Sequence, residues 1–257
     1  MKLYIFGSCS GTEPMPDRHH TAFALEINKR LYWFDAGENC SYTAHMMGLD
    51  LLSVSDIFIS HPHMDHVGGL GNLLWNIQKL TFVTKDLPHF GGITVHTPNL
   101  NTVDGVRMIL RHTEGGFNIK FPLNVNKISD GLLLKNDDIE VTAQHNLHMP
   151  ENENGFQSFS FQILAEGKKI VCSGDVKAIE EIENLIQSGC DVLLMETGHH
   201  CPQEICQKIV QNKWDVKKLL FMHHGRQILY NYDELLPKCR AIFENTHFCN
   251  DKDIFEI

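Results

Sequence analysis

Residues 57–66 read Ile-Phe-Ile-Ser-His-Pro-His-Met-Asp-His, a short apolar run that passes directly into four potential metal ligands. The apolar run predicts a buried strand, and the C-terminal ends of such strands are where α/β folds gather ligand-binding side chains. His61 and His63 are one residue apart, so both imidazoles can reach one ion from a sharply turned loop, while Asp65 and His66 can hold a second ion. Imidazole nitrogen with carboxylate oxygen suits zinc, manganese or iron better than calcium or magnesium. The stretch therefore predicts a metal site.

The full pattern His-x-His-x-Asp-His after a buried strand is far more specific than a lone His-x-His, even in a chain that contains 16 histidines. It closely resembles the signature of the metallo-β-lactamase superfamily. The resemblance implies an α/β fold, a four-layer αββα sandwich, and a site for two divalent metal ions. Zinc is the first candidate for these ions, with manganese and iron as alternatives.

Length and composition favour one domain over residues 1–257, since no repeat, charge block or low-complexity linker divides the chain. No stretch approaches a membrane span. Residues 1–10 lack the apolar region of a signal peptide, and the 8 cysteines form no Cys-x-x-Cys pair. We therefore expect reduced thiols and a cytoplasmic protein.

The net charge of -10, from 22 Lys+Arg against 32 Asp+Glu, makes binding of extended nucleic acid unfavourable.

Apolar patterning predicts alternating strands and helices. Strands are expected at residues 2–6, 21–27, 31–34, 57–59, 138–143, 158–164, 169–173, 192–195 and 218–222. Helices are expected at residues 39–48, 65–80, 176–188, 202–211 and near 233–236. Residues 81–140 show short β-like runs between turns, and their histidines His89, His96 and His112 are interpreted as surface or loop residues. The glycine and proline loop at residues 7–18 is either a plain connection or part of the site wall.

Further candidate ligands follow other predicted strands. His145 and His148 follow the strand at 138–143, and Asp175 follows the strand at 169–173. The two oxygens of Asp175 can bridge two cations, which a histidine cannot do. His223 and His224 follow the strand at 218–222.

Within the superfamily the chain resembles ribonuclease Z, through residues 7–18, Phe34-Asp-Ala-Gly-Glu38, residues 57–70, Ser173-Gly-Asp175, Met195-Glu196 with His200, and residues 219–223. The resemblance implies that His61, His63 and His148 hold one metal and that Asp65, His66 and His223 hold the other, with Asp175 shared. His145 stays open as the alternative to His148, and His224 as the alternative to His223. Asp35 is expected to orient the metal-binding loop. The expected catalytic residues are Asp65, His200 and Glu196. His200 would assist the leaving group, and Glu196 would orient the His200 ring. The competing interpretation of His199 and His200 is a capping or solvated pair before a helix.

One departure bears on function. Ribonuclease Z carries a tRNA-gripping arm between the third motif and the bridging aspartate, but here that interval is 175 − 148 = 27 residues, filled by two predicted strands. We therefore predict a metal-dependent hydrolase that acts through a metal-bridging hydroxide, a phosphodiesterase on a small or flexible substrate. The alternatives are an ester, thioester or lactam hydrolase, a tRNA 3′-processing endonuclease, and a metal-binding module without turnover. Whether two chains pair as a homodimer is left open.

Overall fold

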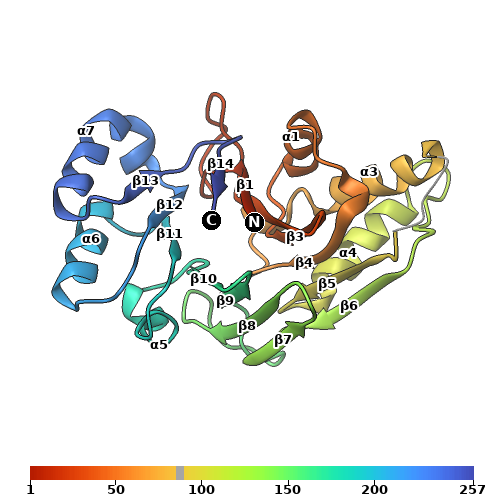
Figure 1. The fold of residues 1–257 in the computed structure, drawn as a ribbon. Coiled ribbons are helices and arrows are strands. Elements are labelled where there is room, and N and C mark those ends of the chain that lie inside the picture. The colour runs from red at the N-terminus through yellow and green to blue at the C-terminus, as the bar shows by residue number, and fades with distance from the viewer. Residues whose placement is uncertain (85–89) are drawn as a thin grey trace.

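The computed structural model describes residues 1–84 and 90–257. In these residues two seven-stranded mixed sheets lie face to face, and helices cover their outer faces (Figure 1). This arrangement confirms the predicted αββα sandwich.

The first sheet is built mainly by the N-terminal half of the chain. Its strand order is β14 (Ile254–Glu256), β1 (Lys2–Gly7), β2 (Ala22–Ile27), β3 (Arg30–Phe34), β4 (Val54–Phe58), β5 (Ile93–Thr97) and β6 (Leu123–Lys127). The helical segments of this half are α1 (Cys40–Met46), η1 (Leu51–Ser53), α2 (Met64–Val67), α3 (Leu70–Val83) and α4 (Leu100–Arg111). Side chains of α1, α3 and α4 share one apolar cluster with the strands beneath them.

The second sheet belongs to the C-terminal half. Its strand order is β13 (Thr246–Phe248), β12 (Leu219–His224), β11 (Val192–Thr197), β10 (Lys168–Cys172), β9 (Phe159–Ala165), β8 (Glu140–His145) and β7 (Gly131–Lys135). The helical segments are η2 (Ile179–Ile182), α5 (Glu183–Ile186), α6 (Pro202–Gln211) and α7 (Arg226–Ile242), and they pack on its outer face. Pro202 is the first residue of α6, where its missing N–H costs nothing.

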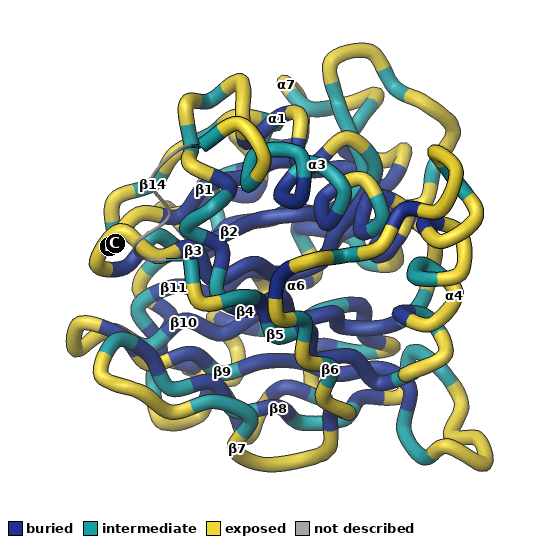
Figure 2. The backbone as a smooth tube through the Cα atoms, turned by 90° about the vertical axis from the view of Figure 1, so that its right-hand side faces the viewer, coloured by how far each residue is buried: buried dark blue, intermediate teal, exposed yellow. Residues whose placement is uncertain are grey.

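Strand β3 shows how period-2 alternation builds the layers. Leu31 and Trp33 point into the cluster beneath the first-half helices, whereas Tyr32 and Phe34 point into the core between the sheets. Phe34 stacks on Phe23 and Phe58 there, with ring centroids 5.0 and 4.9 Å away. Figure 2 shows the resulting pattern of buried strands beneath exposed loops.

The segment at residues 81–140 differs most from the sequence-based expectation. Short strands alternating with turns were predicted, and β5, β6 and β7 lie in this segment, but the structure also contains the 12-residue helix α4, which was not predicted. The Asn99 side chain caps it by accepting a hydrogen bond from the Asn101 N–H, and Val103 and Leu110 bury its inner face.

The interpretation of His96 as a surface or loop residue is wrong. His96 lies on β5 and is buried, with Nε2 3.0 Å from Oδ1 of Asp56 and its ring stacked on Phe58. His112, directly after α4, is exposed as expected, and His89 lies outside the described residues.

Several predicted boundaries also shift. The helix expected at 65–80 is divided into α2 and α3 at Gly68 and Gly69. A Cβ atom at Gly69 would lie 2.1 Å from the Gly37 carbonyl oxygen, so only glycine fits there. The helix expected at 176–188 shrinks to η2 and α5, whereas the one near 233–236 is the much longer α7, kinked at Asn231. In the described residues, no helix combines the length and apolar character that crossing a membrane requires.

Candidate metal centre

Potential ligands from both halves of the chain meet where strands of the two sheets end. The segment after β4 supplies His61, His63, Asp65 and His66, and the loop after β8 supplies His148. Asp175 follows β10, and His223 lies near the end of β12.

One group contains His61, His63 and His148, whose potential ligand atoms lie within 4.8 Å of one another. Nε2 of His148 is 3.3 Å from Nδ1 of His63. His61 is completely buried, while His63 is exposed at the surface. The structure thus brings together the three residues predicted for one ion.

A second group contains Asp65, His66 and His223. Oδ2 of Asp65 is 3.5 Å from Nε2 of His66 and 3.1 Å from Nε2 of His223. All three side chains are almost fully buried.

Asp175 lies between the two groups and is 3 % exposed. Its Oδ2 is 3.7 Å from Nε2 of His61, 3.6 Å from that of His148 and 3.3 Å from that of His223. Its Oδ1 is 3.6 Å from Nε2 of His66. This is the position that a carboxylate shared by two ions would need.

Unpaired polar atoms support a fit to metal ions. Within the described part of the chain, Nε2 of His61, Nε2 of His66 and Oδ1 of Asp175 are buried without any hydrogen-bond partner. Burying such atoms unpaired is costly, so their convergence indicates a ligand that satisfies them together. Nitrogen and carboxylate donors of this kind suit divalent transition ions.

Asp35 forms hydrogen bonds with two residues of the segment after β4, Ser60 and His66. Its Oδ2 is 2.8 Å from Nδ1 of His66, and its Oδ1 accepts a hydrogen bond from the Ser60 N–H at 2.7 Å. The Ser60 hydroxyl donates to Oδ2 of the same carboxylate. These contacts fix the His66 ring and leave its Nε2 facing Asp65 and Asp175. The orienting role of Asp35 toward bound metal stays a prediction.

The electrostatics favour ionised carboxylates among the imidazoles. Burial alone would raise the pKa of Asp65, but its hydrogen bonds with His223 and His66 outweigh burial and hold that pKa well below its usual range. The pKa of Asp175 is lowered in the same way, because the charges of His223 and His66 outweigh the cost of burial. Conversely, burial opposes protonation of His223, but Asp175 and Asp65 raise its pKa to about 10. Anionic oxygens that already attract positive charge are suited to divalent cations.

The alternative ligands face elsewhere. Nε2 of His224 is 2.9 Å from the Cys249 carbonyl oxygen and Nδ1 is 2.9 Å from the Thr197 hydroxyl. Nδ1 of His145 is 2.7 Å from Asp130, and its ring stacks on Phe156. This geometry favours His148 and His223 over them. Both histidines of the pair 223–224 lie within β12, where a register shift and a φ of 53° at His223 turn its side chain relative to its neighbour.

The pair His199 and His200 differs from the expectation. His199 lines the cavity at the site, with Nδ1 3.0 Å from Oε1 of Glu196 and 3.9 Å from Oδ2 of Asp175. Nε2 of His200 instead lies 2.9 Å from the Val176 carbonyl oxygen, although it also remains 3.3 Å from Glu196. The structure therefore favours His199 for the role predicted for His200. His200 was predicted from the resemblance of Met195-Glu196 with His200 to ribonuclease Z, and no other signal in the sequence distinguishes it from its neighbour His199.

A cavity of about 330 Å³ opens above these residues. Ser10, Gly11 and Thr12 form part of its wall, so the loop at residues 7–18 does contribute to the site. Gly198 also borders it, and a Cβ atom there would lie 2.7 Å from Nδ1 of His223, so only glycine fits.

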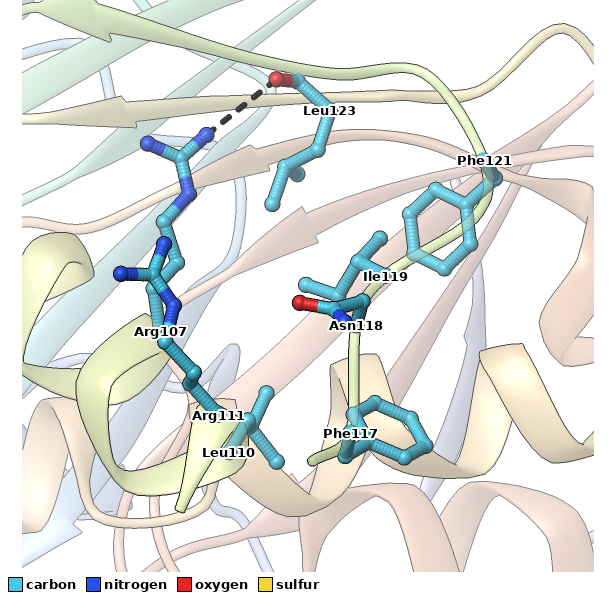
Figure 3. A pocket seen from close by; sticks show the side chains of 8 residues that line it. All are labelled: Arg107, Leu110, Arg111, Phe117, Asn118, Ile119, Phe121 and Leu123. Atoms are coloured by element: carbon cyan, nitrogen blue, oxygen red, sulfur yellow. Dashed lines mark hydrogen bonds between the residues drawn. The ribbon is translucent and has the colours of Figure 1, made fainter. Parts of the chain in front are cut away.

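A separate cavity of about 260 Å³ lies between α4 and the segment that leads into β6 (Figure 3). Two arginines, Arg107 and Arg111, stand on one side and apolar side chains on the other, with Arg107 donating to the Leu123 carbonyl oxygen. None of the predicted site residues lines it, so the predicted chemistry belongs to the first cavity.

Comparisons with known proteins agree with this fold. The family model described as "Anti-Pycsar protein Apyc1" matches residues 1–235. Ribonuclease Z of Methanothermobacter thermautotrophicus is 23% identical over 313 residues, covering 100% of this chain and 97% of that protein. The crystal structure of human tRNase Z, short form, superposes with a TM-score of 0.75 at 17% identity, over 100% of this chain and 99% of that one. Unliganded yeast PDE1 gives a TM-score of 0.65 at 12% identity, over 100% and 99% of the two chains.

Proposed function

Because the chain belongs to the family of the anti-Pycsar protein Apyc1, and is a metal-dependent hydrolase of the ribonuclease Z-like metallo-β-lactamase fold, we propose that it cleaves a phosphodiester in a small or flexible substrate. The observation that carries the proposal is the position of Asp175, which lies within 3.7 Å of His61, His66, His148 and His223. We further propose that this hydrolysis underlies the anti-Pycsar role that the family name gives.

In this proposal two divalent ions are held by the residues described above. His61, His63 and His148 would hold one, and Asp65, His66 and His223 the other, with Asp175 shared between them. When bound, such ions supply Lewis-acid chemistry, which activates water at neutral pH and neutralises charge on a phosphodiester.

The remaining residues would position groups and handle protons. Asp35 and Ser60 hold the ring of His66 in one orientation. The hydrogen bond to Glu196 raises the pKa of His199, so its imidazole is more often protonated at neutral pH. A protonated His199 at the cavity wall would donate a proton to the departing oxygen, while Glu196 holds Nδ1 of the ring.

A phosphodiester is favoured over other substrates by the relatives. Ribonuclease Z and PDE1 carry names that denote cleavage of phosphodiesters. A compact substrate is favoured by the cavity volume of about 330 Å³. Residues 148–175, all of them described, contain β9, β10 and their connections but no protruding arm, which supports a substrate other than tRNA.

The test is a substrate panel with metal-loaded protein. We expect hydrolysis of bis-p-nitrophenyl phosphate or of cyclic nucleotides, and little turnover of thioesters or a lactam. Preference for the thioesters or the lactam would replace the proposal with acyl chemistry. Protein that retains metal but hydrolyses none of these compounds would point to a binding module.

A further inference from the structure

We propose that Asp251 is a positioning residue for the reaction at the metal centre: its buried carboxylate holds both ends of the loop at residues 7–18, so that the tip of this loop, residues 10–12, lies against Asp65. The inference rests on the proposed function, because it concerns the wall of the same cavity. Asp251 does not line that cavity, so it would act through the loop and not on the substrate itself.

The carboxylate of Asp251 accepts hydrogen bonds from both ends of the loop. Its Oδ1 accepts from the N–H and the hydroxyl of Ser8, at 2.9 and 2.7 Å. Its Oδ2 accepts from the N–H of His19 at 2.7 Å and lies 2.9 Å from Nδ1 of the same residue. The side chain is only 3% exposed, and a buried carboxylate needs such partners. One buried group therefore fixes both ends of the loop.

Arg18 adds a second connection between the same two segments. Its Nη1 donates to the Ser8 hydroxyl at 2.8 Å and to the Cys249 carbonyl oxygen at 3.1 Å, and its Nη2 donates to Oδ1 of Asn250 at 2.7 Å. The Ser8 hydroxyl thus accepts from Arg18 and donates to Asp251. Because hydrogen bonds in such a chain polarise and strengthen one another, the network holds the loop more firmly than separate contacts would.

The segment at residues 249–253 is itself attached to both sheets. The Cys249 N–H donates to the Phe221 carbonyl oxygen of β12 at 2.8 Å. The Lys252 N–H donates to the Ile5 carbonyl oxygen of β1, also at 2.8 Å. The carboxylate that holds the loop therefore has a defined position relative to both halves of the sandwich.

The tip of the loop lies directly against the candidate metal ligands. A Cβ atom at Gly11 would lie 3.1 Å from Oδ2 of Asp65, so the Gly11 backbone packs on that carboxylate. The N–H and the hydroxyl of Ser10 both donate to the carbonyl oxygen of His224, the residue after His223, at 3.1 and 3.0 Å. All three residues of the tip line the cavity. A shift of the loop would thus change both the cavity wall and the surroundings of Asp65.

The alternative role for Asp251 is purely structural, in which its hydrogen bonds stabilise the fold and leave the chemistry unaffected. The two roles predict different results for Asp251→Asn, which replaces one carboxylate oxygen with an NH2 group, so that one end of the loop loses its acceptor. A structural role predicts a lower midpoint of urea unfolding and an unchanged kcat in the folded, metal-loaded protein. A positioning role predicts a lower kcat in that same folded, metal-loaded protein.

The first experiment measures hydrolysis of bis-p-nitrophenyl phosphate at saturating metal, under conditions in which each variant is fully folded. We expect Asp251→Asn to lower kcat about tenfold to a hundredfold and to change KM less, because small displacements of positioning groups cost rates of this size. Ser8→Ala, which removes the hydroxyl but keeps the N–H that donates to Asp251, should give a smaller loss in the same direction. Glu256→Gln is the matched control, since this carboxylate on β14 is 76% exposed and lies outside the cavity lining.

Cobalt-loaded protein gives a readout that does not require turnover. The visible absorption of bound Co²⁺ depends on its ligand geometry, so a displaced Asp65 should shift the d–d bands of Asp251→Asn and leave those of Glu256→Gln as in wild type. Either an unchanged kcat or an unchanged cobalt spectrum in folded Asp251→Asn would overturn the inference. If that variant does not fold, the same two measurements on Ser8→Ala decide. If wild type hydrolyses no phosphodiester, the proposed function fails, and the cobalt spectra alone decide the role of Asp251.

Discussion

Nε2 of His223 lies 3.1 Å from Oδ2 of Asp65, although 158 positions separate the two residues in sequence. Asp65 comes from the segment after β4 in the first sheet, and His223 comes from β12 in the second. The contact therefore joins the two halves of the sandwich at the proposed metal centre. Its geometry depends on the packing of both sheets, so it reports on the fold as well as on the site.

Replacing Asp175 by alanine should remove bound metal and activity together. Asp175 is the carboxylate that approaches both groups of potential ligands, so in our proposal both ion positions depend on it. We expect the loss of activity to exceed the 10–100-fold typical of residues that only support ligands. Metal content by mass spectrometry and hydrolysis of bis-p-nitrophenyl phosphate measure the two effects. Asp233→Ala, an exposed site on α7, is the control; a metal-loaded, fully active Asp175→Ala protein would refute the site.

Replacing Asp35 by asparagine should weaken metal binding without removing it. The substitution loses the charged acceptor that orients Nδ1 of His66, and supporting residues of this kind typically cost about 10–100-fold in metal affinity. Chelator competition measures the affinity directly. Ser60→Ala should show a smaller loss, because Asp35 keeps its contacts with the Ser60 N–H and with His66. Equal affinity in wild type and Asp35→Asn would contradict the orienting role.

The roles of His199 and His200 can be distinguished by replacing each of them with alanine. His199→Ala should keep its metal and lose about 100-fold or more in kcat, as expected for a proton donor. His200→Ala should retain most of kcat and lose about 1 kcal/mol of stability, because its Nε2 bonds to the Val176 carbonyl oxygen instead. Steady-state kinetics and chemical unfolding check the two outcomes. The reverse result would restore the role to His200.

The stability of the metal-free protein should fall as the pH drops from 6.5 towards 3. Burial, reinforced by the charge of Arg18, lowers the pKa of His224 to about 3 from its ordinary 6.5. Between these values the unfolded chain binds a proton at this residue and the folded chain does not, so acid favours unfolding by up to about 1.4 kcal/mol per pH unit. Urea unfolding at pH 7 and pH 5 in the presence of a chelator measures the slope. His224→Gln should lose less stability over this interval; an unchanged slope would show that other groups dominate.

The metal-binding segment could be predicted from sequence because its chemistry is local. Residues 57–66 combine a buried strand with closely spaced ligands, and that combination has few other uses. His148 and Asp175 could be placed because each follows a recognisable strand and matches the ribonuclease Z pattern. Their roles as ligands stay predictions until a metal is measured.

The remaining features depend on contacts that the sequence does not reveal. His96 is buried because it pairs with Asp56, 40 residues earlier on the neighbouring strand. Helix α4 was hidden by Gly105 and by polar residues with weak helix preference, and it forms because Val103 and Leu110 pack on the sheet. The choice between His199 and His200 depends on side-chain directions in a short turn, which spacing alone cannot determine.

Strand β14 shields the backbone of β1 at the edge of the first sheet. Its three residues pair with Lys2, Leu3 and Tyr4 of β1 and cover the outer edge of the first sheet. Without them β1 would present unsatisfied backbone amides and carbonyls beside a strongly apolar run, which is the template that invites intermolecular β-pairing and aggregation. Removing or displacing residues 254–256 thus risks insoluble protein, although these residues contribute no side chain to the metal centre.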